Sequence, residues 1–328
     1  MPATESRIPA QGGPHTVEGF RTDVLRIIEA YPHQPVFPLF VQLRELRERA
    51  LKALERRNPE ERSQQLLHTT GLICAAMTNA AFDQGQSSAA EGQARTAHRC
   101  AELAGDQALR CWIRGTEALI AYWDERYQDA VDLAADGRRF VPGSGTALVR
   151  LAAVEARAHA HLGDAAAAEQ ALARAAVARA EVGGPDEPGG LLEFPLPKQQ
   201  AYAATTELWL GGRERVARAE RAAAEAIGGY LRAPADKRRI GELCLARLDL
   251  AAVRIARDDL DGAGEQIGEV LTAAAGRRTE EVVRRLRQLV RALHRTRHQS
   301  APEAIELRER IGAFCAARGV SPLVNLPV

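Results

Sequence analysis

The side chains of this chain that could do chemistry do not form a familiar catalytic motif. The sequence lacks the Gly-x-Ser-x-Gly, Gly-x-x-x-x-Gly-Lys-Ser/Thr and His-Glu-x-x-His patterns, which supply an activated serine, a phosphate-binding loop and a zinc site. His294 and His298 are spaced i, i+4 and would share a helix face, as metal-binding pairs do. Arg291, Arg295 and Arg297 surround them without a following carboxylate, and this positive charge disfavours a cation. We therefore predict solvated histidines and expect no catalytic residue, no metal site and no cofactor.

An arginine-rich segment, residues 277–297, is the second candidate for chemistry. Four of its arginines form one helical stripe, opposite an apolar stripe of Val282, Leu286, Leu289 and Leu293: Arg284, Arg287, Arg291 and Arg295. Such a stripe could contact nucleic acid or an acidic partner. The alternative is the wet face of an amphipathic helix, which the nearby Glu280 and Glu281 and the nearly neutral chain favour.

The composition indicates that helices position these residues. Lys and Arg number 44 and Asp and Glu number 43, which excludes a wholly basic nucleic-acid protein and an acidic disordered tail. Hydrophobic residues make up 46% of the 328 and aromatic residues only 5%, and alanine is unusually frequent. Alanine, leucine, arginine and glutamate favour helices, so we predict an all-α chain of two domains or one elongated array.

Targeting and redox signals indicate a cytoplasmic protein. The five cysteines form no metal or redox motif, which indicates reduced thiols. Residues 1–17 lack the apolar stretch of a signal peptide and show no periodicity, so we expect a flexible tail. Charged residues interrupt every apolar run, so we expect no membrane span.

A repeated turn-and-anchor pattern divides the helical sequence. Leu162-Gly163-Asp164 ends one helix, and the small residue Ala168 follows five positions after the glycine. Similar patterns place small or apolar anchors at 90, 130, 168, 216 and 263, a spacing of roughly 38–48 residues. We therefore predict five helix–turn–helix units, with a non-repeating helical bundle as the alternative.

These five units resemble the tetratricopeptide repeat (TPR). The resemblance implies a superhelix, or α-solenoid, with repeats over residues 61–276. We expect capping helices at 18–60 and 277–320. The family's small residue opens the second helix of each unit and lets it pack close to the first.

Two segments also resemble the sensor half of bacterial Xre-type helix-turn-helix regulators. They are Arg110–Trp123, which reads RCWIRGTEALIAYW, and Gly190–Tyr202, which reads GLLEFPLPKQQAY. In that family a DNA-binding domain precedes a TPR-like array. Here the first helix is expected near residue 18, which leaves no room for that domain. We therefore predict no specific DNA binding by this chain alone.

The TPR resemblance also predicts which side chains face the concave groove. Counting back from each anchor to the first helix gives Asn79, Phe82, Trp112, Thr116, Tyr122, Arg150, Arg157, Lys198, Tyr202, Thr205 and Asp249. Arginine binds carboxylate or phosphate in a bidentate manner, and aromatic rings add flat apolar area. This combination predicts an anionic ligand with an apolar part. The alternative is that the arginines pair with Glu155 or Asp164 while the aromatic rings are core.

The segment 183–198 is the longest break in the array and carries four prolines. It is either a binding element that folds apolar side chains inward or a linker that packs over the repeats.

We expect the whole chain to be a cytoplasmic sensor or adaptor that binds a peptide, a protein or a small anion and acts through a partner. A structural scaffold, which could be a homo-oligomer, and a non-standard biosynthetic enzyme are the alternatives.

Overall fold

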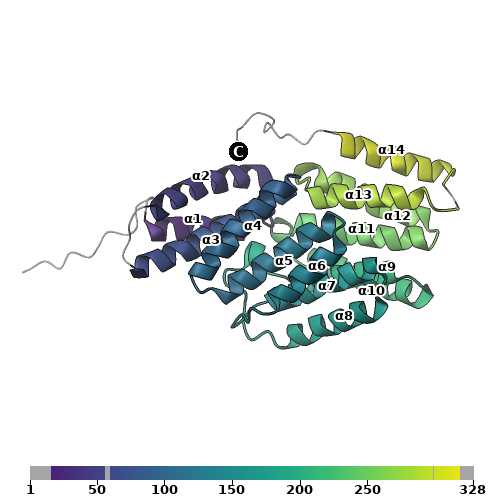
Figure 1. Ribbon diagram of the computed structural model, residues 1–328. Coiled ribbons are helices and arrows are strands. Elements are labelled where there is room, and N and C mark those ends of the chain that lie inside the picture. The colour runs from purple at the N-terminus through teal and green to yellow at the C-terminus, as the bar shows by residue number, and fades with distance from the viewer. Residues whose placement is uncertain (1–15, 56–59, 298, 318–328) are drawn as a thin grey trace, which may run out of the picture.

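The computed structural model describes residues 16–55, 60–297 and 299–317. These residues form fourteen α-helices and three short 3-10 helices and contain no strand (Figure 1). The all-α prediction is therefore confirmed. Of the expected tail, residues 1–15 lie outside the described residues, and the first helix begins at Val17. No helix within the described ranges is long and apolar enough to cross a membrane.

Five pairs of neighbouring helices make up the middle of the chain. The pairs are α3 (Glu60–Asp83) with α4 (Ser87–Leu103), α5 (Gln107–Trp123) with α6 (Tyr127–Gly137), α7 (Ala147–Leu162) with α8 (Ala165–Ala180), α9 (Leu196–Leu210) with α10 (Arg213–Leu231), and α11 (Ile240–Ala256) with α12 (Leu260–Ala273). Two helices precede them and two follow: α1 (Val17–Ala30), α2 (Val36–Leu54), α13 (Glu280–Leu293) and α14 (Pro302–Ala316). The 3-10 turns are η1 (Gly190–Leu192), η2 (Ala235–Lys237) and η3 (Ala274–Gly276).

The turn inside each pair follows one pattern. A residue with positive φ stands two positions before the second helix, and it is Gly85, Glu125, Gly163, Gly211 or Asp258. The left-handed conformation ends the first helix and turns the chain back. The fully buried alanines at 90, 130, 168 and 263 lie five positions after these residues. Four of the five predicted anchors therefore have the expected position and burial.

The predicted anchor at Val216 is wrong. Val216 is only partly buried, and Ala219 and Ala223 instead face the neighbouring helix without exposure. The difference begins in the turn, where Gly211 has ψ −176° but the equivalent Gly163 has ψ 8°. Because Gly211 is extended, α10 begins in a different register. The buried face of α10 therefore starts at Ala219, three residues after Val216.

The first helices of the pairs form an inner layer. Among the packed helix pairs, α5 lies against α7, α7 against α9, and α11 against both α9 and α13. The second helices pack outside their own partners. Because each first helix touches the next first helix, the described part of the chain is a helical array, and α13 continues its inner layer.

The two ends of the array meet. The helix α13 contacts α3. The Trp123 indole donates to the Glu281 carboxylate at 2.7 Å, and Arg284 donates to Asp124 and to the Trp123 carbonyl, both at 2.6 Å. The Arg284 side chain is thus not on a wet face, contrary to that interpretation of the stripe. It joins the last pair of helices to the second repeat.

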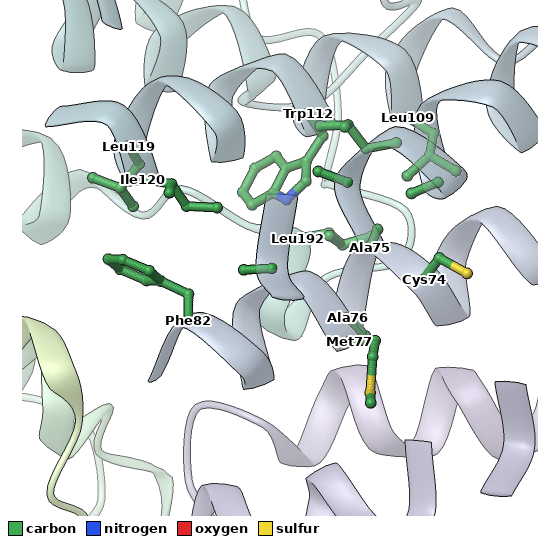
Figure 2. Close-up of a cluster of buried hydrophobic side chains, with 14 of the residues drawn as sticks. Cys74, Ala75, Ala76, Met77, Phe82, Leu109, Trp112, Leu119, Ile120 and Leu192 are labelled. Atoms are coloured by element: carbon green, nitrogen blue, oxygen red, sulfur yellow. The ribbon is translucent and has the colours of Figure 1, made fainter. Parts of the chain in front are cut away.

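The segment 183–198 packs inward. Gly190 has φ +60°, and a Cβ at this position would lie 2.4 Å from the Ile28 carbonyl oxygen of α1. Only glycine allows this close approach. Leu192 and Phe194 are buried, whereas Leu196 is 51% exposed at the start of α9. The segment therefore joins α1 to the core between α3 and α5, where Figure 2 shows Leu192 beside Trp112.

Candidate functional site

All eleven predicted groove residues lie on inner-layer helices, and most line two adjoining spaces. The first space encloses about 650 Å³, part of it continuous with solvent, and Asn79, Phe82, Trp112, Arg150 and Lys198 line it. The second encloses about 340 Å³, and among its lining residues are Arg157, Lys198, Tyr202 and Asp249. The other three predicted residues, Thr116, Tyr122 and Thr205, contact Arg150, Arg157 and Asp249 respectively.

Arg150 is a buried cation without an acidic partner. Its side chain is 3% exposed. It donates to Thr116 Oγ1 at 2.9 Å and to the Trp112 carbonyl oxygen at 3.1 Å, and its guanidinium lies 4.2 Å from the Trp112 ring. No carboxylate of the described residues forms an ion pair with it. Burial lowers the pKa of Arg150 to about 10, because nearby charges offset only part of the lost hydration.

The indole of Trp112 is a second unsatisfied donor at the same place. Trp112 Nε1 is buried and has no hydrogen-bond partner among the described residues. Trp112 points from α5 toward α3 in Figure 2. Buried N–H groups normally have an acceptor, so this position lacks one. Arg150 and Trp112 both line the first space.

Arg157 is held by aromatic rings rather than by acids. Its guanidinium lies 4.1 Å from the centroids of both Tyr122 and Tyr202, and its Nε has no partner. Within the described ranges it makes no ion pair. The alternative is therefore wrong about pairing with Glu155 or Asp164, although the aromatic rings are buried in the hydrophobic core, as it expected. Glu155 pairs with Arg138 and Arg174, and Asp164 caps α8 by accepting from the Ala167 amide.

The other predicted charged residues are neutralised within the groove. Lys198 and Arg239 lie 3.1 and 2.9 Å from the Glu242 carboxylate, which also accepts from the Tyr230 hydroxyl at 3.0 Å. Burial raises the pKa of Glu242, but Arg239 and Lys198 outweigh it and lower the pKa to about 2. Asp249 pairs with Arg285 at 2.7 Å and accepts from Thr205 at 3.0 Å. Lys198 and Asp249 are therefore satisfied without a ligand.

An acidic wall faces Arg150 across the first space. The Tyr31 hydroxyl donates to Asp83 Oδ2 at 2.7 Å, and Glu281 also lines the space. Burial and the neighbouring Glu281 raise the pKa of Asp83 to about 6. The described lining holds four cations and three acids, which are Arg150, Lys198, Arg239, Arg277, Asp83, Glu242 and Glu281. One cation is in excess, and Arg150 has no acidic partner.

Several lining residues were missed by the repeat-based prediction. Glu242 lies seven residues before Asp249 on α11, and this two-turn spacing on one helix face would have found it. Glu281 and Arg285 lie on α13, which was taken for a cap although it continues the inner layer. Tyr31 and Arg239 lie just outside helices, where no periodic signal exists.

The groups around Arg150 set the chemistry of the first space. The unsatisfied groups near Arg150 are donors, which an anion's oxygens would accept from. No three His, Cys, Asp or Glu side chains of the described residues gather as metal ligands would. In comparisons with known proteins, no protein-family model matches the chain and no curated protein matches it.

Proposed function

We propose that this chain is a cytoplasmic TPR-like sensor that binds a small organic anion inside its helical array and acts through a partner protein. The observation that carries the proposal is Arg150, a buried guanidinium with no acid within ion-pair distance. Burying an unpaired charge is costly, and the usual compensation is a partner of opposite charge. A bound carboxylate or phosphate supplies that partner.

The surroundings favour a ligand with a flat apolar part. The Trp112 ring stacks on Arg150, and Phe82 and Leu119 line the same space. The N-terminal helices and α13 close the array around this space, since Tyr31, Thr279 and Glu281 also line it. An extended peptide needs an open groove, so the closed shape favours a small molecule over a peptide.

The regulatory role rests on the resemblance of two segments to the sensor half of Xre-type regulators. Those segments carry Trp112 and Tyr202, which lie on the inner layer of the array. A ligand that ties α3, α5 and α7 together changes the relative stability of the closed array, and a partner can respond to that change.

The test is thermal stabilisation by defined anions. Benzoate and phenyl phosphate are compared with neutral benzamide, using the wild type, Arg150→Met, and Arg139→Met as control. Arg139 is an exposed arginine whose side chain is 78% accessible. We expect the anions, but not benzamide, to raise the Tm of the wild type and of Arg139→Met. A concentration of 100 times Kd corresponds to about 2.7 kcal/mol of stabilisation.

Two results would contradict the proposal. Benzamide could stabilise the wild type as much as benzoate does, which would show that the charge is not recognised. The anions could also stabilise Arg150→Met as much as the wild type, which would place their binding elsewhere. A folded wild type that responds to neither anion would also contradict it.

A further inference from the structure

A second depression, here called the trough, lies between the ends of three inner-layer helices. It encloses about 860 Å³, part of it continuous with solvent. Its walls come from the C-terminal ends of α9 and α11 and from one face of α13. The lining residues are Leu208, Trp209, Ala252, Ile255, Ala256, Arg285, Gln288, Leu289, Arg291, Ala292, Arg295 and Thr296.

The apolar surface of the trough includes an exposed tryptophan held in place by its neighbours. Trp209 is 40% exposed. Its ring packs against His161 with centroids 4.1 Å apart, and His161 stacks on Tyr127 at 4.2 Å. Burial, with Arg157 and Arg285 nearby, lowers the pKa of His161 to about 3, so this support stays neutral at physiological pH. Trp209 thus offers a fixed aromatic surface to the trough.

The charge of the lining is one-sided. It holds three arginines and no acid. Arg291 reaches Glu125 outside the trough at 3.2 Å, where both side chains are mostly exposed. Arg295 is exposed, and its side chain makes no ion pair or hydrogen bond with any described residue. The rim is therefore positive, and an anion meets no repelling carboxylate in the lining.

A buried cation lies at the base of the trough. Arg285 is 3% exposed, pairs with Asp249 at 2.7 Å and donates to Gln288 at 2.9 Å. Its Nε is buried and has no hydrogen-bond partner in the described part of the chain. A buried N–H without an acceptor is uncommon in proteins.

We propose that the trough is a second binding site, for a small amphipathic organic acid. The apolar body of the ligand lies on Trp209, Ile255 and Leu289. Its carboxylate or phosphate group points to Arg285 and Arg295. This proposal does not depend on the ligand of the inner groove, because Arg150 and Trp112 do not line the trough.

Calorimetric titration with decanoate, decyl phosphate and neutral decanamide tests the proposal. The variant Arg295→Glu reverses a charge on the rim. Arg287→Glu makes the same change on the same helix at an exposed residue outside the trough, and is the matched control. We expect wild type and Arg287→Glu to bind decanoate alike, and Arg295→Glu to bind at least tenfold more weakly. The carboxylate and phosphate arms show which head group is preferred.

A spectroscopic readout locates the ligand. Decanoate is expected to change the tryptophan emission of the wild type much more than that of Trp209→Phe, while calorimetry shows both proteins binding. Arg150→Met is expected to bind decanoate as the wild type does. Loss of binding in Arg150→Met with normal binding in Arg295→Glu would overturn the proposal, because the acid would then lie in the inner groove.

Two further outcomes would also overturn it. Decanamide could bind as tightly as decanoate, which would leave no role for the arginines. Alternatively, sedimentation could show a dimer that Ala292→Glu converts into a folded monomer. In that case a second copy of the chain covers the trough.

Discussion

Replacing Arg150 with methionine tests whether the array keeps this cation at a cost to its own stability. Burial lowers the pKa of Arg150 from 12.5 to about 10. At 1.36 kcal/mol for each pKa unit, this fall corresponds to about 3 kcal/mol. The folded pKa is below the unfolded one, so the cost is fully present below pH 10 and is relieved as the pH rises toward 12.5. At neutral pH the folded protein therefore carries the whole cost.

The substitution also removes favourable contacts, and these nearly balance the relief. Arg150 gives up two hydrogen bonds to neutral oxygens and its stacking on Trp112, which together contribute about 3 kcal/mol. The two acceptors still bond to each other in the variant, because the Thr116 hydroxyl donates to the Trp112 carbonyl oxygen at 3.2 Å. Methionine fills the space of the arginine stem. We expect the free energy of unfolding to change by no more than about 1 kcal/mol.

Arg285→Met is the matched comparison, because it removes a buried arginine that does have an acid. It leaves Asp249, which is 6% exposed, with Thr205 as its hydrogen-bond partner. Leaving a buried charge without its ion-pair partner lowers the free energy of unfolding by about 3–5 kcal/mol. Urea unfolding followed by circular dichroism at neutral pH measures both variants. If Arg150→Met loses as much stability as Arg285→Met, then Arg150 is a structural residue and the reasoning for a groove ligand fails.

Three further predictions concern the groove acids and DNA. Glu242→Gln leaves Lys198 without an acidic partner and Arg239 with Glu193 alone, and it should lower the free energy of unfolding by about 3–5 kcal/mol at pH 7. Since the folded pKa of Glu242 is about 2, this difference should shrink as the pH falls from about 4.5 toward 2 in urea titrations. Asp83→Asn should raise the Tm at pH 7.5 but hardly at pH 4, because the raised pKa of about 6 penalises the folded state only as the pH rises above 3.8. The penalty is about 3 kcal/mol, and equal effects at both pH values would contradict it. Anisotropy titration at about 150 mM salt should show no sequence-selective binding of duplex DNA below about 1 µM.

The fold was predictable because its signals are short in sequence. A positive-φ turn residue and a small residue five positions later both act within one helix–turn–helix pair. Gly163 and Ala168 show this, and the same spacing holds at Gly85 and Ala90. The prediction fails at Gly211, where two adjacent glycines allow a backbone conformation that one glycine and an aspartate do not suggest.

The faces of the helices were predictable, but the partners of the side chains were not. Counting back from the anchors, as the TPR resemblance implies, placed Arg150, Arg157 and Tyr202 on the first helices, which form the inner layer. Whether a cation is paired depends on segments far away in the chain. Glu281 reaches Trp123 across 158 residues because α13 returns to the first repeats. Local pattern contains no information about that return. The acidic partner of Lys198 is likewise on another helix, α11, 44 residues later, so Lys198 looked as free as Arg150.

The contrast among the groove cations is the strongest argument that the array binds an anion. Lys198, Arg239 and Arg285 each have a carboxylate within 3.3 Å, and these pairs stabilise the closed array. Arg150 lines the first space with Lys198 and Arg239, is more deeply buried than either, and has none. A methionine there would fill the space without the charge, so the fold itself does not require an arginine. The unpaired charge is instead suited to a partner that arrives from solution.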